Sequence, residues 1–325
     1  MAPRMFDCRS LRCWAAFAAL CIMISGGRAA AKATFVTFNV GIVAGINAAS
    51  TVTGWKPNDG DSFIRTVDGT VTTFVVPGAS ATEALRINDQ GTITGFYRDS
   101  AGQAHGFVRI SDGTITTFDV HNANGVGPIS INNKGEVTGS YTDGTGNHGF
   151  VRTSGGRIKT FDVSGAIETA SVCINDKGVS VGYYLDSNHI THGFLRAADG
   201  TITTFDVPGA SETLGICINA KGTVDGEYGT DGRHGFIRYA DGTITTFDGQ
   251  DCNIFSAGIN DKGVVTGSCQ DRQHPGRFLG FVRKPDGTVN EFRVPDGGNS
   301  TTPVGINNAG VIVGNYRRGG FLRFP

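Results

Sequence analysis

The stretch HGFLRAADGTITTFDVPGASETLGICIN, residues 192–219, contains the parts of a unit that recurs along this chain. It holds a Gly-Phe-x-Arg segment, an Asp-Gly turn at 199–200, a β-branched segment at 201–207 and a segment that ends in Ile-Asn. β-Branched and aromatic residues favour strands, and Asp-Gly favours a tight hairpin turn. The stretch therefore predicts short antiparallel strands, and it has no helical period.

The unit occurs seven times. Its Ile-Asn element ends at Asn47, Asn88, Asn132, Asn175, Asn219, Asn260 and Asn307. Its Gly-Phe-x-Arg element, or a close variant, ends at Arg65, Arg109, Arg152, Arg196, Arg238, Arg283 and Arg323. Each unit reads as four strands, and four strands in about 40 to 45 residues are the signature of a propeller blade. We therefore predict an all-β, seven-bladed β-propeller with four antiparallel strands in each blade.

The two ends of the repeat predict how the ring closes. The last unit stops at Pro325 without a fourth strand. The segment 34–40, TFVTFNV, has the fourth-strand pattern and precedes the first inner strand. We expect this N-terminal strand to complete the last blade, which leaves no open sheet edge at the seam.

Residues 1–33 are predicted to be a secretory signal peptide that is removed, with cleavage after Ala31 or Ala33. A basic start is followed by an apolar run too short to span a bilayer, and no later segment is apolar enough to do so. Removal takes five of the 28 basic residues and one of the 29 acidic residues, which leaves a net charge of about −5. We expect an extracellular or periplasmic monomer that does not bind nucleic acid.

Four of the units carry a His-Gly-Phe motif at the start of the third strand. The copies are His105-Gly106-Phe107, His148-Gly149-Phe150, His192-Gly193-Phe194 and His234-Gly235-Phe236. With this motif the chain resembles the secreted HAF-repeat proteins of bacteria, named for a His-Ala-Phe-type motif, over its whole length after residue 33. The resemblance implies an extracytoplasmic propeller and brings no established chemistry. Gly replaces the family's middle Ala in every copy.

The same histidines have aspartate partners in the predicted hairpins. The hairpin register places each histidine opposite an aspartate 14 residues later, in the pairs His105 and Asp119, His148 and Asp162, His192 and Asp206, and His234 and Asp248. Histidine and aspartate are lost together in the sixth blade, where Leu279 and Arg293 stand. Four copies of a catalytic dyad in one chain are implausible, so we interpret the pairs as structural cross-strand hydrogen bonds.

Four cysteines remain after residue 33, an even number that suits an oxidising compartment. Cys252 and Cys269 flank the first hairpin of one blade, so a disulfide is plausible there. Cys173 and Cys217 occupy the same repeat position in adjacent blades, and a bridge between them requires Cα atoms within about 7 Å. The sequence leaves this second bridge open. No cysteine or histidine spacing indicates a zinc site.

Two further patterns resemble functional sites. The acidic loops at Asp143-Gly144 and Asp231-Gly232 are of a kind that can bind calcium, but no spacing supplies six oxygen ligands. We therefore expect no cofactor and keep calcium as the alternative. Residues 178–182 match the Gly-x-Ser-x-Gly pattern of hydrolases. The repeat places Ser180 at a core position of a strand, where the required strand-to-helix elbow cannot form.

A ligand site should lie among the residues that break the repeat, on the face we call the top face. This face carries the loops that enter strand one and the loops between strands two and three. Arg86 stands where the other units have small residues, and we expect it to point toward the central channel. The candidate ligand-face residues are Glu83, Arg86, His121, Glu168, His189, Glu212, Asp251, Arg272 and His274, with Trp55, Arg98 and Arg277 beside them.

The repeat predicts fold and compartment more sharply than function, and the catalytic residues, if any, are unknown. The leading hypothesis is a non-catalytic binding propeller that presents blade-specific loops to a glycan, a peptide or an envelope protein. The first alternative is a lyase or hydrolase of extracellular polysaccharide with its site at the channel mouth, in which His121 or His189 acts with Arg86. The second alternative is a purely structural module.

Overall fold

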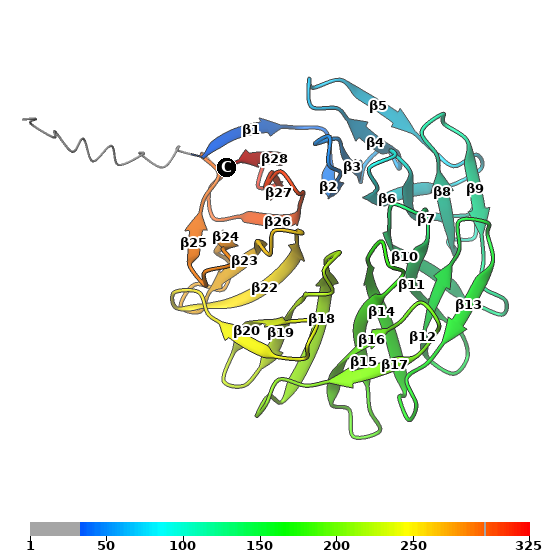
Figure 1. Ribbon diagram of the computed structural model, residues 1–325. Coiled ribbons are helices and arrows are strands. Elements are labelled where there is room, and N and C mark those ends of the chain that lie inside the picture. The colour runs from blue at the N-terminus through cyan, green and yellow to red at the C-terminus, as the bar shows by residue number, and fades with distance from the viewer. Residues whose placement is uncertain (1–32, 296) are drawn as a thin grey trace, which may run out of the picture. The chain divides into compact units, whose positions relative to one another are not determined.

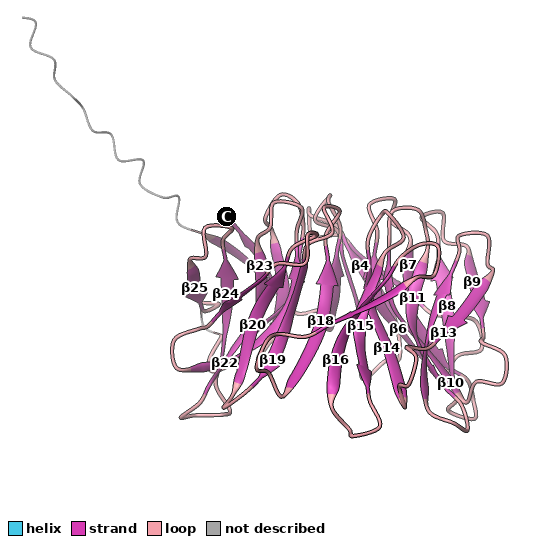
Figure 2. Cartoon of the chain, turned by 60° about the horizontal axis from the view of Figure 1, so that its bottom comes forward, coloured by secondary structure: helices cyan, strands magenta, loops and turns pink. Residues whose placement is uncertain are grey.

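The computed structural model describes residues 33–295 and 297–325, and these residues form 28 strands and no helix. The strands make seven four-stranded sheets around a central channel, as Figure 1 shows from one face and Figure 2 from the side. The predicted seven-bladed β-propeller is confirmed. The predicted signal peptide lies outside the described residues. Within them, no helix has the length and apolar character needed to span a membrane.

Each blade runs from an inner strand to an outer strand in chain order, and only the last blade takes its outer strand from the N-terminal side. Blade 1 comprises β2 (Ile42–Ile46), β3 (Val52–Trp55), β4 (Ser62–Arg65) and β5 (Val71–Phe74). Blade 2 comprises β6 (Ala81–Ile87), β7 (Ile93–Arg98), β8 (Ala104–Arg109) and β9 (Ile115–Phe118). Blade 3 comprises β10 (Gly125–Ile131), β11 (Val137–Thr142), β12 (Asn147–Arg152) and β13 (Ile158–Phe161).

The other four blades follow the same plan. Blade 4 comprises β14 (Glu168–Ile174), β15 (Ser180–Leu185), β16 (Thr191–Arg196) and β17 (Ile202–Phe205). Blade 5 comprises β18 (Glu212–Ile218), β19 (Val224–Gly229), β20 (Arg233–Arg238) and β21 (Ile244–Phe247). Blade 6 comprises β22 (Cys252–Ile259), β23 (Val265–Asp271), β24 (Phe278–Arg283) and β25 (Val289–Phe292). Blade 7 comprises β26 (Thr301–Ile306), β27 (Ile312–Tyr316), β28 (Gly319–Phe324) and β1 (Thr34–Phe38).

The ring closes as predicted, by pairing the first strand with the last. β1 lies antiparallel to β28, with Phe35 opposite Arg323 and Phe38 opposite Gly320. Figure 1 shows β1, in blue, beside β28, in red. The chain then passes directly from β1 into the inner strand of blade 1, so the closing strand ties blade 7 to blade 1.

The Gly-Phe element of strand three supplies the core between blades. Its phenylalanines are fully buried in all seven blades, at Phe63, Phe107, Phe150, Phe194, Phe236, Phe281 and Phe321. In six blades the glycine before this phenylalanine lies under the strand-four phenylalanine of the same blade. A Cβ on Gly149 would be 2.6 Å from the ring of Phe161, and one on Gly106 would be 2.4 Å from the ring of Phe118. The aromatic ring of the strand-four phenylalanine therefore explains why glycine, and not alanine, follows the histidine.

The arginine that ends strand three joins neighbouring blades. Its guanidinium lies over the ring of the strand-four phenylalanine of the preceding blade, with 4.4 Å between Arg65 and Phe38 and 5.0 Å between Arg152 and Phe118. The same stacking occurs at Arg109, Arg196, Arg238, Arg283 and Arg323. A cation over an aromatic face is attracted by the ring quadrupole. These arginines are therefore part of the scaffold in every blade.

The asparagine of each Ile-Asn element forms a second joint, around the channel. Its Nδ2 donates to the backbone carbonyl of the corresponding asparagine in the next blade, and Asn307 completes the ring by donating to Asn47. Its Oδ1 accepts backbone N–H groups of its own turn, as Asn175 does from Lys177 and Val179. All seven asparagines are buried. This ring explains why asparagine, rather than another turn residue, recurs.

The described residues contain two disulfides. Cys252 and Cys269 are joined within the first hairpin of blade 6, with 5.4 Å between their Cα atoms. Cys173 and Cys217 are joined across the inner strands of blades 4 and 5, with 5.0 Å between their Cα atoms. The first bridge was expected from the hairpin. The second settles the possibility that the sequence left open, because its Cα separation is inside the limit for a disulfide.

Candidate functional site

The strand directions divide the candidate residues between the two faces of the ring. Each inner strand begins at the top face and ends at the opposite face, which we call the bottom face and which carries the Ile-Asn turns. Figure 2 shows loops at both faces. Most candidates therefore lie at the top face. Arg86 is two residues before the turn asparagine Asn88, so it lies toward the bottom face.

The four histidine–aspartate pairs share one geometry. The Nδ1 atoms of His105, His148 and His192 lie 2.7, 2.9 and 2.9 Å from a carboxylate oxygen of Asp119, Asp162 and Asp206, and His234 contacts Asp248 in the same way. Each imidazole packs against a strand-two tyrosine with 5.0–5.1 Å between ring centroids, at Tyr97, Tyr141, Tyr184 and Tyr228. The repetition of the whole arrangement in four blades fits a scaffold and not a single active site.

A second aspartate faces the other nitrogen of these rings. Asp143 and Asp231, weighed above as calcium ligands, lie 3.2 Å from Nε2 of His148 and His234 respectively. Partial burial lowers the pKa of His148, but the two aspartates outweigh it and the net pKa is raised. Hydrogen bonds from Thr145, with a contribution from His148, lower the pKa of Asp143 to about 2. In the described structure both loop aspartates therefore serve these local contacts.

A large hollow lies at the top face where the ring closes, and we call it the seam cavity. Its volume is about 1030 Å³. It lies between the β3–β4 loop, the β27–β28 loop and the β1–β2 connection, and its lining includes Asn39, Lys56, Asn58, Asp59, Asn315, Tyr316, Arg317 and Arg318. Lys56 is 3.6 Å from Asp59. Arg317 and Arg318 are exposed and form no ion pair among the described residues, so the cavity has an excess of positive charge.

The seam cavity contains none of the candidate residues named from the sequence. The residues chosen from the sequence lie on other loops of the top face, whereas Arg317 and Arg318 form a two-residue link between β27 and β28. The adjacent arginines were the available signal. Their proximity to Lys56 depends on the closure of the ring, because the two loops are far apart in the sequence.

A second group lies between blades 5 and 6, and we call it the blade 5/6 cluster: Glu212, Asp225, Glu227, Arg233 and Ser256. Arg233 is 2.9 Å from Glu212 and 2.7 Å from Glu227. Ser256 donates its backbone N–H to Glu227 at 2.7 Å and its hydroxyl to Asp225 at 2.5 Å. The cluster therefore joins strand two of blade 5 to the inner strand of blade 6.

Burial controls the charge of this cluster. Asp225 and Glu227 are 0% and 5% exposed. Burial raises the pKa of Asp225 to about 7, against the opposing hydrogen bond from Ser256. Burial also raises the pKa of Glu227, against the opposing effect of Arg233. Two carboxyl groups so enclosed are closed to a substrate and serve as a joint between blades.

The sequence reasoning included Glu212 but missed Asp225 and Glu227, although the repeat carried the signal. Segment 224–228 reads VDGEY, whereas the corresponding segment 137–141 reads VTGSY. In blades 1, 2, 3 and 6 the position of Asp225 is a threonine whose hydroxyl donates to a strand-three carbonyl, at Thr53, Thr94, Thr138 and Thr266. The same comparison that singled out Arg86 would have found these two acids.

Arg272 extends the contact between blades 5 and 6 to the top face. Its Nε donates to Oδ1 of Asn253 at 3.2 Å, and the same oxygen accepts the backbone N–H of Arg233 at 3.1 Å. A Cβ on Gly232 would lie 2.5 Å from the Arg272 guanidinium, so the arginine covers the loop of the neighbouring blade. Arg272 is thus held by contacts within the protein.

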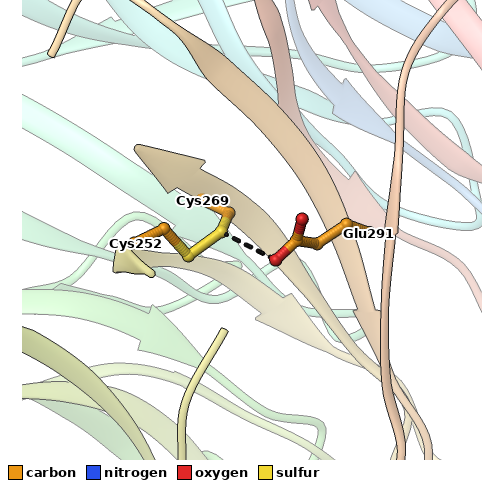
Figure 3. Close-up of side chains that lie close together, drawn as sticks. All are labelled: Cys252, Cys269 and Glu291. Atoms are coloured by element: carbon orange, nitrogen blue, oxygen red, sulfur yellow. Dashed lines mark hydrogen bonds between the residues drawn. A yellow bond between two sulfur atoms is a disulfide. The ribbon is translucent and has the colours of Figure 1, made fainter. Parts of the chain in front are cut away.

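A smaller hollow of about 360 Å³ lies at the top face of blade 6 and brings together Asp251, His274 and Arg277. The Cys252–Cys269 disulfide and Glu291 line the same hollow. Figure 3 shows Glu291 directed at the disulfide, with 3.2 Å between its Oε1 and Cys269 Sγ. The two sulfur atoms and the carboxylate are close enough to share a metal ion, but sulfur atoms joined in a disulfide are not thiolate ligands.

Arg98 lies at a third hollow, of about 390 Å³, between blades 2 and 3. Arg98 and Phe96 line it together with the apolar side chains of Leu85, Val126, Ile129 and Tyr141. Glu83 is opposite Phe96 in the sheet, and its partial burial raises its pKa against the opposing charge of Arg98. This hollow is mainly apolar, in contrast to the seam cavity.

The remaining candidates are dispersed. His121 and His189 are exposed on the β9–β10 and β15–β16 loops, and Glu168 is exposed at the first position of β14. Arg86 lines the channel, where its Nη1 donates to the backbone carbonyls of Ala44 and Leu85 at 2.6 and 3.0 Å. Arg86 and His121 therefore lie toward opposite faces of the ring. The arrangement considered for a lyase, with Arg86 beside His121 or His189, is not formed by these positions. Ser180 is fully buried in β15.

No family model matches the sequence of the chain, and no curated protein matches it in sequence. Solved structures resemble it in fold. A catalytically inactive virginiamycin B lyase from Staphylococcus aureus, crystallised with quinupristin, aligns with a TM-score of 0.66 at 13% identity and covers 90% of this chain and 99% of its own. The propeller domain of the Trilobed protease from Pyrococcus furiosus aligns with a TM-score of 0.61 at 10% identity, over 87% and 95%. TolB from Acinetobacter baumannii aligns with a TM-score of 0.53 at 13% identity, over 74% and 63%.

Proposed function

We propose that the chain is a non-catalytic binding propeller, exported to the periplasm or the cell exterior, and that its seam cavity binds an acidic glycan. The observation that carries the proposal is the lining of the seam cavity, where Arg317, Arg318 and Lys56 face a single acid, Asp59. The solved structures of similar fold include a lyase and TolB, so the fold alone does not choose between catalysis and binding.

The lining suits a uronate-containing chain. Arginine forms charge-assisted, bidentate hydrogen bonds with carboxylates. The amide side chains of Asn39, Asn58 and Asn315 supply donors and acceptors for hydroxyl groups, and the Tyr316 ring offers an apolar surface. A volume of about 1030 Å³ is large enough for several sugar residues. The charge and the polar groups together favour an acidic oligosaccharide over a neutral one.

Two features support export. The two disulfides are typical of proteins that fold in an oxidising compartment. The His-Gly-Phe copies make the secreted HAF-repeat proteins the family to which we assign the chain. Both features agree with the leader predicted at residues 1–33.

The proposal is tested by measuring the binding of the purified protein to polygalacturonate, alginate and neutral dextran by isothermal titration calorimetry. We expect binding of the two acidic polymers and none of dextran. The affinity should fall as salt concentration rises, because exposed charges are screened. The double variant Arg317→Ala/Arg318→Ala should lose at least ten-fold in affinity.

The variant Arg272→Ala is the matched control, because it removes an arginine from the same face outside the seam cavity. It should bind as the unaltered protein does. Equal binding by the double variant would remove the seam cavity as the site. Unsaturated products that absorb at about 235 nm would replace the proposal with the lyase alternative. Failure to bind any of the polymers would favour the purely structural module.

A further inference from the structure

Arg86 is the one residue at its repeat position that carries a charge. The residue before Ile-Asn is small in the other six blades, namely Gly45, Ser130, Cys173, Cys217, Gly258 and Gly305. These small residues leave a hollow of about 130 Å³ inside the channel, lined by Arg86 together with inner-strand residues of blades 1, 4, 5, 6 and 7. The long cation of blade 2 therefore stands in space that the other blades leave free.

The protein compensates this charge only in part. Nη1 of Arg86 donates to two backbone carbonyls, but Nε and Nη2 have no hydrogen-bond partner among the described residues. Nor does Arg86 form an ion pair within residues 33–295 and 297–325. Burial lowers the pKa of Arg86, yet a guanidinium remains charged in proteins. Arg86 is half-buried, so its free N–H groups reach the channel and can donate charge-assisted hydrogen bonds to an anion there.

The channel mouth at the bottom face has the opposite charge. A hollow of about 230 Å³ at this mouth is lined by Arg86 and also by Asp89, Asp176 and Asp261. Neighbouring turns hold these carboxylates in place: Asp89 accepts the backbone N–H of Ala48 at 2.8 Å, and Asp261 accepts that of Ala220 at 2.8 Å. One hollow thus has a cation toward its inner end and three carboxylates around its opening.

We propose that this end of the channel binds a small zwitterion of the amino acid class. Its carboxylate pairs with Arg86, and its ammonium group faces the aspartates. A simple polyanion would be repelled by the aspartates at the opening, and a simple cation would be repelled by Arg86. Only a ligand with both charges satisfies both ends. The site is separate from the seam cavity, which opens at the top face.

The test is a thermal-shift and calorimetric screen of the purified protein against the common amino acids, with acetate and methylammonium as single-charge probes. A ligand that binds the folded state raises Tm in proportion to the logarithm of its concentration once it exceeds Kd. We expect at least one amino acid to bind ten-fold or more tightly than either single-charge probe. The screen contradicts the proposal if no amino acid binds, or if acetate binds as tightly as the best amino acid.

Variants separate the site from nonspecific effects. Arg86→Gly introduces the residue that blades 1, 6 and 7 have at this position, and it should abolish amino acid binding while the protein still folds. Arg86→Gln leaves a shorter, uncharged side chain that can still donate hydrogen bonds, and it should weaken binding at least ten-fold. Asp89→Asn should reduce the preference for amino acids over acetate. Arg318→Ala, in the seam cavity, should bind amino acids normally. Unchanged binding by both Arg86 variants would overturn the assignment.

Discussion

Single residues that depart from the repeat show what each repeat position does. At one strand-two position four blades have a threonine that donates a hydrogen bond, and blade 5 has Asp225. An ionised carboxylate cannot donate, and Oδ1 of Asp225 is buried without a partner. The protonated form can donate as threonine does, which agrees with the raised pKa of about 7. Blade 5 has thus replaced a neutral hydrogen bond by a group that titrates near neutrality.

Asp225→Thr should stabilise the protein at pH 8 and change its pH profile. The pKa of Asp225 in the folded state, about 7, is above the ordinary value of 3.8, so its contribution to stability is lost as pH rises from about 4 to 7. Replacement of the buried charge by the threonine of the other blades should raise the free energy of unfolding at pH 8 by about 2 kcal/mol. Urea unfolding at pH 5 and pH 8 measures this. If the free energy of unfolding differs between pH 5 and pH 8 by the same amount in the variant as in the unaltered protein, Asp225 does not titrate in this range.

His148→Ala should lower stability more at pH 5.5 than at pH 8.5. The folded-state pKa of His148 is raised above 6.5, so the charged pair with Asp162 and Asp143 is fully present below that pH and is lost as pH rises through the folded pKa. We expect a loss of roughly 1 kcal/mol at pH 5.5, measured by thermal unfolding. Glycan and amino acid binding should not change. Unaltered stability together with lost binding would mean that the pair has a functional role.

At the scale of the element, packing between strands explains why certain residues recur, whereas the sequence alone shows only that they do. The hairpin register, the turns and the four strands of each blade follow from alternation and turn residues, so they could be predicted. The ring of asparagine hydrogen bonds could not, because it depends on how blades are placed around the channel. The blade 5/6 cluster and the seam cavity depend on contacts between different units. A repeat specifies each unit but not the spaces that its non-repeating loops leave.

Gly149→Ala should destabilise the protein because the Phe161 ring lies where the new Cβ would be, at 2.6 Å. Overpacking of this kind costs about 1–3 kcal/mol. Gly155→Ala is the matched control in the same blade, since the nearest atom to its new Cβ is 4.0 Å away. Urea unfolding of both variants makes the comparison. Equal changes in the free energy of unfolding of the two variants would show that the Phe161 ring moves aside without cost.

Asn175→Ala should weaken the ring around the channel. It removes a donor to the backbone carbonyl of Asn219 and leaves the N–H groups of Lys177 and Val179 without their acceptor. An unpaired buried polar group costs about 1–3 kcal/mol, so we expect a loss of about 3 kcal/mol in the free energy of unfolding. Asn188→Ala, in an exposed loop, is the control and should change it by less than about 0.5 kcal/mol. A similar loss of unfolding free energy in both variants would show that the ring of asparagine hydrogen bonds has no special role in stability.

The whole molecule is a repeat in which blade 7 combines three strands from the end of the sequence with β1. In blade 6 five residues, Lys284-Pro285-Asp286-Gly287-Thr288, connect strand three to strand four, from Arg283 to Val289. In blade 7 Arg323 lies opposite Phe35 in the same register, with Phe324 and Pro325 on one side of the break and Thr34 on the other. Only an Asp-Gly pair is missing from the connection.

A circular permutant that joins Pro325 to Thr34 through Asp-Gly and begins at Gly41 should therefore fold with the same circular dichroism spectrum. It should unfold at a lower urea concentration than the natural arrangement, because no covalent link then ties blade 7 to blade 1. A permutant as stable as the natural chain would show that blade packing alone holds the ring closed.

Deletion of residues 34–40 without rejoining exposes the edge of β28 and should cause aggregation, measured by light scattering.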